Sequence, residues 1–289
     1  MSLVKPKLAG GPPGPPTTGK FDIGRLRFNL DKSDLDDGLS FLIHGNYGAG
    51  KTHLIGDMLR EEAKDGPIAF INTVGEDGST SVADMGLGEQ GYNVSSRVEL
   101  LDLCDYFIAN GRLAALGIDS ARVLQHFVIR AVVGKERWES LELDIQPGEW
   151  NNIHRAMSQT LLKLKQTAKW VLCVCTSDIS VDMVTSQTTT SMGTKSAGGK
   201  VSKGSFVSPD LYGKMHSVIA ASFDMAGFLR AEAMGNKAER SVRFTTSNNI
   251  LTRQRLTHEI TADIPIPHGK GGWTAIKNTV EAHMKKGGG

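Results

Sequence analysis

The sequence has few aromatic residues, little net charge and no long apolar run. Aromatic residues make up 6% of the 289 residues, which argues against an extensive platform for stacking nucleic-acid bases. The formal net charge is +2, so any nucleic-acid surface has to be a local basic patch. No apolar stretch approaches the ~20 residues that span a bilayer, and no apolar signal-peptide region is present. We therefore expect a cytoplasmic protein that binds no membrane.

Cysteine is also scarce. Cys104, Cys173 and Cys175 are too few for a disulfide framework. Cys173 and Cys175 lie two residues apart in an apolar run, so a strand would place both on one face. Because no Cys or His partners follow at zinc spacing, we expect the two thiols to pack in the core.

Strand-like and helix-like segments alternate along the chain. This alternation predicts an α/β fold, with a mostly parallel sheet covered by helices on both faces. We expect a flexible Pro/Gly-rich arm at 1–36, a single main domain at 37–265 and a C-terminal tail at 266–289. Strands are expected at 39–44, 68–71, 98–103, 113–118 and 170–175, and helices at 52–64, 120–132 and 150–164.

The most specific motif is a phosphate-binding loop. Residues Gly45-Asn46-Tyr47-Gly48-Ala49-Gly50-Lys51-Thr52 fit G-x-x-x-x-G-K-[ST], with an apolar strand before and a helix after. Backbone N–H groups of such a loop converge on phosphate oxygens. Lys51 is expected to reach the β- and γ-phosphates and Thr52 to bind Mg²⁺, so the expected ligand is ATP with magnesium. His44 and His53 flank the loop and are expected to be structural.

Such a loop needs carboxylates nearby. Asp119 follows the apolar 113–118 segment and is the expected second magnesium residue, with a helix-capping role as the alternative. Asp144 and Asp178 fit that role less well. Glu76 follows the second expected strand and is the candidate for activating water, with an ordinary solvated turn as the alternative.

A stretch without acids follows the last of these strands. Residues 183–209 contain Lys195, Lys200 and Lys203 among Ser, Thr and Gly, so we expect a mobile loop that binds single-stranded DNA without reading its sequence. The stretch comes shortly after Thr176, Ser177 and Asp178, a candidate sensor of the γ-phosphate. The alternative is a surface loop whose lysines merely keep the protein soluble.

With these motifs in place, the chain resembles the RecA-like ATPase core, and more narrowly the phage-type single-strand annealing ATPases of the Sak-four type. The similar segments span about residues 39 to 256 and are FLIHGNYGAGKTHL, LAALGIDSARVL, EWNNIHRAMSQTLLKLKQTAKWVLCVCTSD, SPDLYGKMHSVIAASFDMAGFLR and NNILTRQRL. The resemblance implies ATP hydrolysis coupled to single-stranded DNA in phage recombination, annealing or repair. It also implies a homo-oligomer or filament in the host cytoplasm, with a single-strand binding protein as a possible partner.

The resemblance further implies that Arg253 and Arg255 contact the nucleotide of a neighbouring subunit, whereas the residues alone also fit a solvated basic strand end. Two departures stand out. Val74 occupies the position where RecA-like proteins usually have a catalytic Glu, and Arg253 replaces a frequent Lys. Two other functions stay open: a helicase or packaging motor, and a nucleotide-gated assembly protein with little turnover.

Overall fold

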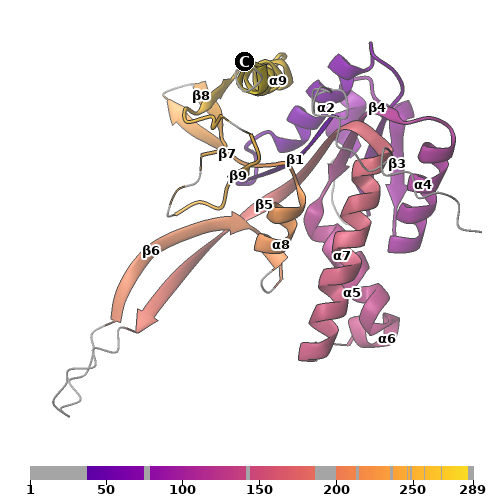
Figure 1. Ribbon diagram of the computed structural model, residues 1–289, viewed down its shortest axis with the longest axis vertical. Coiled ribbons are helices and arrows are strands. Elements are labelled where there is room, and N and C mark those ends of the chain that lie inside the picture. The colour runs from indigo at the N-terminus through magenta and orange to yellow at the C-terminus, as the bar shows by residue number, and fades with distance from the viewer. Residues whose placement is uncertain are drawn as a thin grey trace, which may run out of the picture. The chain divides into compact units, whose positions relative to one another are not determined.

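A mostly parallel sheet flanked by helices forms the centre of the structure, as the α/β expectation required (Figure 1). The computed structural model describes residues 38–74, 79–140, 144–185, 200–212, 215–234, 237–245, 247, 249–256, 258–267 and 269–285. Side chains of residues 179–205 are not described. All of the described residues belong to the unit Asp34–Gly289. The expected arm at 1–36 lies outside the described residues.

The sheet has ten strands among the described residues, in the order β10-β8-β7-β1-β5-β4-β2-β3, with β6 paired to β5 and β9 to β7. Neighbours from β7 to β3 run parallel, and β6, β8, β9 and β10 pair antiparallel. The strands are β1 (Leu39–Gly45), β2 (Ile68–Thr73), β3 (Gly91–Val94), β4 (Leu113–Asp119), β5 (Ala168–Thr185), β6 (Lys200–Pro209), β7 (Met225–Met234), β8 (Lys237–Arg243), β9 (Arg253–Gln254) and β10 (Ile264–Ile266).

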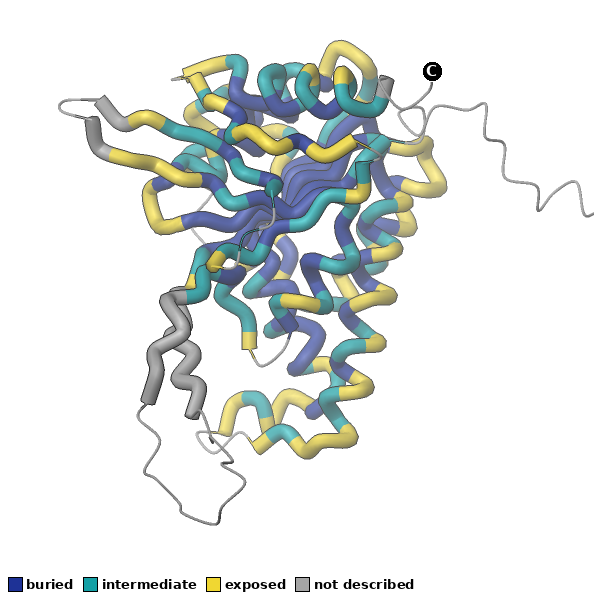
Figure 2. Tube along the Cα trace, turned by 60° about the vertical axis from the view of Figure 1, so that its left-hand side comes forward, coloured by how far each residue is buried: buried dark blue, intermediate teal, exposed yellow. Residues whose placement is uncertain are grey.

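Helices cover both faces of the sheet. One core contains side chains of α4, α5, α7 and α8, and the other contains side chains of α2, α3 and α9. Figure 2 shows the central strands buried and the helices exposed on their outer sides. The helices are α2 (Lys51–Glu62), α3 (Ser79–Asp84), the 3-10 turn η2 (Gly88–Gln90), α4 (Arg97–Ala109), α5 (Ala121–Val133), α6 (Lys135–Trp138), α7 (Pro147–Thr167), α8 (Met215–Ser222) and α9 (Gly272–Lys285).

Strand β5 shows how sequence alternation fills both cores. Cys173 and Cys175 point into the core beneath α5 and α7, whereas Trp170, Leu172 and Val174 point into the core beneath α2. All five side chains are at most 2% exposed. A strand buried on both faces reads as a continuous apolar run, which is why this segment was recognisable. The expectation that the two thiols pack in the core is confirmed.

The expected strand at 98–103 is wrong, because these residues belong to helix α4. Ser96 caps the helix and accepts a hydrogen bond from the backbone N–H of Glu99. Leu100, Cys104 and Phe107 recur at helical spacing and are the buried side chains of α4. The Ser-x-x-Glu pattern formed by Ser96 and Glu99 is typical of a helix N-terminus, but the short apolar run that follows it also fits a strand.

The expectation of a mobile loop over 183–209 is also wrong for the described part of that segment. Strand β5 continues to Thr185, and β6 returns antiparallel to it, with Thr185 opposite Lys200 and Ser177 opposite Pro209. Figure 1 shows the two strands running out together beyond the sheet. We call this pair the β5–β6 ribbon. Valine, which recurs in both strands, favours extended backbone. Residues 186–199 lie outside the described residues.

Residues 266–289, expected as a tail, contain helix α9, which packs on α2. The indole N–H of Trp273 donates to Oε1 of Glu62 over 2.7 Å, and its backbone N–H donates to Oδ2 of Asp57 over 2.8 Å. Lys277 also donates to Glu62 over 2.7 Å. Trp273 and Glu62 are almost fully buried. The end of the chain therefore fixes the helix that begins in the Gly-Lys-Thr motif.

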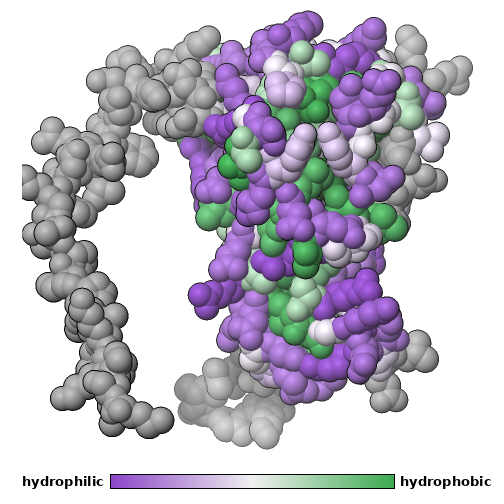
Figure 3. All heavy atoms as spheres, turned by 90° about the vertical axis from the view of Figure 1, so that its right-hand side faces the viewer, coloured by the Kyte–Doolittle hydropathy of each residue, from purple (hydrophilic) through white to green (hydrophobic). Residues whose placement is uncertain are grey.

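Figure 3 shows a largely hydrophilic face interrupted by small groups of apolar side chains. In the part of the chain that the structure describes, no helix combines the length and apolar character needed to cross a bilayer. Among the described residues, the large apolar side chains that are exposed are Tyr47, Val74, Val98, Tyr106, Ile108, Leu162 and Tyr212.

Candidate functional site

The candidate site lies where the parallel strands of the sheet end. Gly45 at the end of β1 is opposite Thr176 on β5, and Asp119 at the end of β4 is opposite Val174 on β5. The carboxyl ends of these strands therefore meet at one edge, the usual place for ligands in open α/β sheets. Thr176 lies on the strand between the other two, so polar groups from three strands converge.

Residues 45–52 form a glycine-rich turn between β1 and α2, which we call the 45–52 loop. Gly48 and Gly50 have φ values of 72° and 96°, a left-handed region that glycine adopts without strain. Helix α2 begins at Lys51, so its first backbone N–H groups face the edge of the sheet. The Lys51 ammonium donates to the carbonyls of Gly45 and Asn46 over 3.0 and 2.9 Å. The loop thus presents glycine backbone, a helix N-terminus and one cation.

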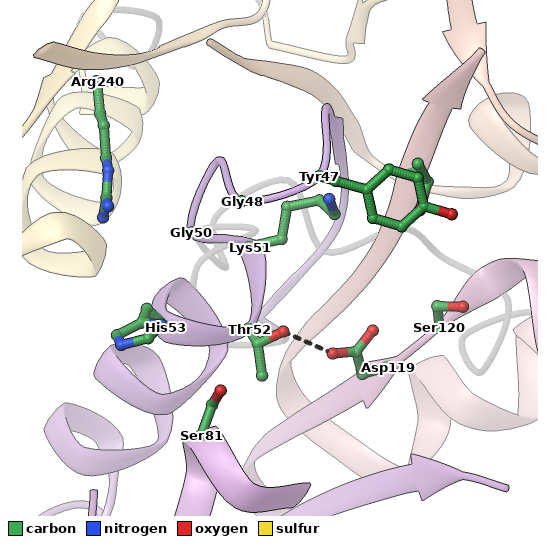
Figure 4. A pocket seen from close by; sticks show the side chains of 11 residues that line it. Tyr47, Gly48, Gly50, Lys51, Thr52, His53, Ser81, Asp119, Ser120 and Arg240 are labelled. Atoms are coloured by element: carbon green, nitrogen blue, oxygen red, sulfur yellow. Dashed lines mark hydrogen bonds between the residues drawn. The ribbon is translucent and has the colours of Figure 1, made fainter. Parts of the chain in front are cut away.

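Thr52 and Asp119 are brought together across the edge of the sheet. The Thr52 hydroxyl donates to Oδ2 of Asp119 over 2.7 Å (Figure 4). A second set of bonds fixes Asp119: Thr73 on β2 donates to the Asp119 carbonyl over 2.6 Å and accepts from the backbone N–H of Ser120 over 2.9 Å. The peptide bond between Asp119 and Ser120 is cis. The structure therefore brings together the two residues that were expected to bind magnesium, and hydrogen bonds with Thr73 hold the Asp119 backbone.

The donor chemistry of this pair fits magnesium. Hydroxyl and carboxylate oxygens are the hard ligands that Mg²⁺ takes, usually one or two from protein with the rest from water and phosphate. Within the described residues, no group of three or more His, Cys, Asp or Glu side chains gathers as a metal site. Mg²⁺ does not need a cage of protein ligands, so the Thr52 and Asp119 oxygens could serve as its protein ligands.

A cavity of about 370 Å³ opens over the 45–52 loop. Such a volume falls within the range of small-molecule pockets. Figure 4 shows the side chains of α2, β4 and β8 around it. The described lining residues are Tyr47, Gly48, Gly50, Lys51, Thr52, His53, Ser81, Asp119, Ser120, Thr176 and Arg240.

Asp119 is the one carboxylate among these described lining residues. Asp144 precedes α7, where its side chain accepts from Gln146, and Asp178 lies on β5 opposite Ser208; neither lines the cavity. Glu76, the expected water-activating residue, lies outside the described residues. Ser81 and Arg240 were not expected from the sequence. Nothing local marks either residue, since both reach the cavity through tertiary packing.

His44, just before the loop, is completely buried and tied to two other segments. Its Nδ1 lies 2.9 Å from Oγ of Ser177, and its Nε2 lies 2.8 Å from the carbonyl oxygen of Leu251. Burial lowers the pKa of His44 from 6.5 to about 4; the bond to Leu251 opposes this shift, and the nearby Lys51 cation adds to it. The side chain is therefore neutral at pH 7, in line with a structural role.

Arg253 and Arg255 do not reach the cavity of their own chain. Arg253 on β9 is opposite Ala226, near the start of β7. Arg255 donates to the carbonyl of Ala221 over 2.6 Å and lies 3.5 Å from Asp224. Asp224 in turn accepts from the backbone of Ser40, at the start of β1. Both arginines thus lie toward the amino ends of the strands, and a contact with a neighbouring subunit stays a prediction.

The β5–β6 ribbon begins at the cavity. Thr176 lines the cavity, and its carbonyl accepts from the backbone N–H of Asp210 over 2.8 Å, where β6 has ended. Asp210 also forms an ion pair with Arg122 on α5. Lys200 and Lys203 belong to β6, and Lys195 lies outside the described residues. The structure therefore connects the ribbon to the site but does not place the three ammonium groups.

Comparison with known proteins adds no family. The chain matches no protein-family model, and no curated protein matches it either. The α/β fold, the mostly parallel sheet and the geometry around the 45–52 loop therefore carry the functional argument.

Proposed function

We propose that this protein is a magnesium-dependent P-loop ATPase with a RecA-like core that acts on single-stranded DNA. The observation that carries the proposal is the 2.7 Å contact between Thr52 and Asp119, directly beside a glycine-rich loop that opens a helix. A chance match to the loop motif has no reason to place a carboxylate from a distant strand at the hydroxyl of the motif's last residue.

The residues of the site divide the work on ATP. Backbone N–H groups of the 45–52 loop and of the first turn of α2 bind phosphate oxygens, and Lys51 neutralises charge on the β- and γ-phosphates. Thr52 and Asp119 would hold Mg²⁺, which neutralises phosphate charge when bound. Thr176, 8% exposed, lies between the loop strand and the Asp119 strand, where it can hydrogen-bond the γ-phosphate or the attacking water.

The strand order supports a RecA-like core. Strand β5 lies between β1, which leads into the loop, and β4, which ends at Asp119. Six neighbouring parallel strands, β7-β1-β5-β4-β2-β3, make up this part of the sheet. This order supports the proposal because the polar end of β5 lies beside the strand that leads into the loop, where the proposal expects the γ-phosphate.

We propose single-stranded DNA as the second ligand because the β5–β6 ribbon, which contains lysines, lies next to the cavity. The ribbon starts at Thr176 and contains Lys200 and Lys203, with Lys195 between its strands in the sequence. Residues 183–209 contain no acid, although the β5 half of the ribbon also carries Asp178 and Asp182. Lysines bind phosphates independently of sequence. A change at Thr176 on ATP binding can therefore reach the DNA-binding segment through β5. A homo-oligomer or filament, with Arg253 and Arg255 acting between subunits, belongs to the same proposal.

Calorimetry on Lys51→Ala tests the nucleotide assignment. The variant loses tight MgATP binding, because Lys51 is the lysine that the loop directs at the phosphates. Lys64→Ala is the matched control, since Lys64 is exposed beyond the other end of α2. Unchanged MgATP affinity in Lys51→Ala rejects the assignment.

An ATPase assay with and without single-stranded DNA tests the rest. Stimulation by DNA supports a DNA-dependent ATPase, and absence of turnover leaves a nucleotide-gated binding protein. Glu76→Gln slows turnover and spares ATP binding if Glu76 takes the proton of the attacking water, because an amide is not a base. An unaltered rate assigns that role to another group.

A further inference from the structure

Arg240 reaches the 45–52 loop from strand β8, which is separated from β1 by β7. It lies on β8, yet its guanidinium packs against Gly50: a Cβ atom added to Gly50 would lie 2.7 Å from Nη1 and 3.1 Å from Cζ of Arg240. Both residues line the cavity. In Figure 4 Arg240 and Asp119 stand on opposite sides of the loop. The cavity therefore has a cation on one side and the Thr52–Asp119 pair on the other.

The position of this guanidinium is unfavourable unless an anion binds beside it. Arg240 lies at the N-terminal end of α2, where the helix dipole is positive and repels a cation. The first turn of α2 contains no acid that would offset this, and Lys51 adds a second positive charge. Arg240, Lys51 and the helix N-terminus thus concentrate positive potential around one space.

The guanidinium is not satisfied by the described part of the protein. Its Nε is buried and has no hydrogen-bond partner among the described residues. Asp57 lines a neighbouring hollow with Arg240, but the two described side chains form no ion pair. Both oxygens of Asp57 instead accept backbone N–H groups, from Gly271 over 3.2 Å and from Trp273 over 2.8 Å.

We propose that Arg240 binds the nucleotide of its own subunit, at the phosphates nearer the nucleoside. This inference rests on the proposed nucleotide-binding function. In the proposed function the Thr52–Asp119 pair marks the side of magnesium and the γ-phosphate, and Arg240 lies across the loop from Asp119. The α- and β-phosphate oxygens are therefore within its reach. A planar guanidinium with several N–H groups suits two oxygens of one phosphate chain.

The dimensions of the site favour phosphate over the base as the partner of Arg240. The hollow between Arg240, Leu54, Ile266 and Pro267 holds about 20 Å³, enough for a single water molecule. No base or ribose fits there, so Arg240 does not form the wall of a nucleoside pocket on that side. Its open side is the 370 Å³ cavity over the loop.

The sheet holds the Arg240 backbone in position. Arg240 is opposite Ala231 on β7 and opposite Ile266 on β10, so strands flank it on both sides. Little backbone entropy is lost when such a residue binds a ligand. The contact is therefore prepared within one chain and needs no second subunit.

Titrations of Arg240→Ala and Arg240→Lys with MgATP and with MgADP test the proposal. Arg240→Ala lowers the affinity for MgATP and for MgADP by the same factor, roughly 10- to 100-fold, because a charge-assisted hydrogen bond is lost. Arg240→Lys recovers part of the loss, since it keeps the charge without the planar fork. Arg230→Ala on β7 is the matched control: it removes an exposed arginine, paired with Glu232, that does not line the cavity. Thermal unfolding of each variant checks the fold.

Two results overturn the proposal. Unchanged affinity of folded Arg240→Ala for both nucleotides removes Arg240 from the site, and loss of ATP affinity with full retention of ADP affinity places it at the γ-phosphate instead. The variant Lys51→Ala distinguishes failure of the Arg240 inference from failure of the proposed nucleotide-binding function. If Lys51→Ala loses MgATP binding and Arg240→Ala does not, only the Arg240 inference fails; if Lys51→Ala binds normally, the nucleotide site itself is wrong.

Discussion

His44, at the end of the strand that leads into the 45–52 loop, forms a 2.9 Å hydrogen bond with Ser177, where the β5–β6 ribbon begins. The Leu251 carbonyl can only accept, so the imidazole Nε2 carries the proton and donates to it over 2.8 Å. Nδ1 of the neutral ring is then the acceptor for the Ser177 hydroxyl. One buried side chain thus joins the loop strand, the ribbon and the segment before β9.

This arrangement predicts a specific loss of stability in mild acid. His44 has a pKa of about 4 when folded and an ordinary pKa of 6.5 when unfolded, so between these pH values the unfolded chain binds a proton that the folded chain does not. Its contribution is therefore complete above pH 6.5 and falls as the pH drops toward 4. The decrease in the free energy of unfolding is on the order of 3 kcal/mol, at ~1.4 kcal/mol per pKa unit.

Urea unfolding of wild type and His44→Gln between pH 7.5 and 4.5 measures this contribution. The glutamine amide keeps a donor and an acceptor but does not titrate, so the variant is less stable at pH 7.5 and loses less stability on acidification. His258→Gln, at an exposed histidine, is the control and keeps the wild-type slope. Equal slopes for wild type and His44→Gln would contradict the buried neutral histidine.

The contact between Thr52 and Asp119 predicts a defect confined to magnesium. In Asp119→Asn, and in Thr52→Val, the Mg²⁺ concentration needed for half-maximal ATP binding rises, by roughly 10- to 100-fold if the loss matches that seen for groups around other metal sites. Metal-free ATP binds Asp119→Asn at least as well as wild type, because a negative charge near the phosphates is gone. Thr52→Ser retains the hydroxyl and behaves like wild type.

Nucleotide fluorescence titrations with Mg²⁺ and with EDTA separate the two effects. Asp65→Asn removes an exposed carboxylate away from the cavity and serves as the control. A wild-type magnesium titration for Asp119→Asn would reduce Asp119 to a structural residue preceding α5.

Local signals in the sequence were enough to predict that the 45–52 loop and Asp119 lie at the same edge of the sheet. The 45–52 loop is continuous in sequence, and β1, β4 and the core part of β5 are apolar runs whose order fixes a shared edge. Parallel pairing then brings Asp119 to Thr52 although 67 residues separate them. The buried strands were recognisable because both faces demand apolar side chains.

The positions of Arg240 and of α9 depend on contacts with residues that are distant in the sequence, and no local pattern predicts such contacts. Arg240 meets Gly50 because β7 pairs with β1 and β8 folds back on β7, and the sequence around Arg240 contains no motif. Helix α9 follows a Gly-rich turn and reads as a tail until Asp57 and Glu62 are seen to bind its first turns. In α4 a mixed apolar segment satisfied both strand and helix patterns, and the capping serine decided between them.

The location of Arg255 predicts how a shared active site would be detected. Within its own chain Arg255 lies beside Asp224, at the opposite end of the strands from Thr176. Arg255 can therefore act only on ATP that is bound to a neighbouring subunit. Mixing Arg255→Ala subunits with Lys51→Ala subunits then restores part of the ATPase activity, since some interfaces combine an intact Lys51 with an intact Arg255.

The Arg255 side chain is 47% exposed, so its ion pair with Asp224 contributes about 0–1 kcal/mol and Arg255→Ala stays folded. Arg230→Ala subunits mixed with Lys51→Ala subunits are the control and show only the activity of their own intact sites. If no ratio of the first pair exceeds the sum of the separate variants, Arg255 does not act across an interface.

The last prediction concerns the β5–β6 ribbon and single-stranded DNA. Changing Lys195, Lys200 and Lys203 to Ala lowers affinity for a labelled single strand, measured by fluorescence anisotropy, and makes the plot of log affinity against log salt shallower. The slope changes by up to about two units, because each phosphate contact on a single strand contributes ~0.7. Changing the same three residues to Arg keeps the charge and keeps most of the affinity.

The position of the ribbon adds a nucleotide dependence to this prediction. Its first pair, Ser177 opposite Pro209, lies directly beyond Thr176, and Asp210 is bonded to the Thr176 carbonyl. MgATP therefore changes DNA affinity in wild type, whereas in Lys51→Ala the affinity is the same with and without nucleotide. Unchanged affinity and salt slope in the triple alanine variant would move the DNA site away from the ribbon. A normal salt response without any effect of MgATP would keep DNA on the ribbon and disprove its coupling to the nucleotide through Thr176.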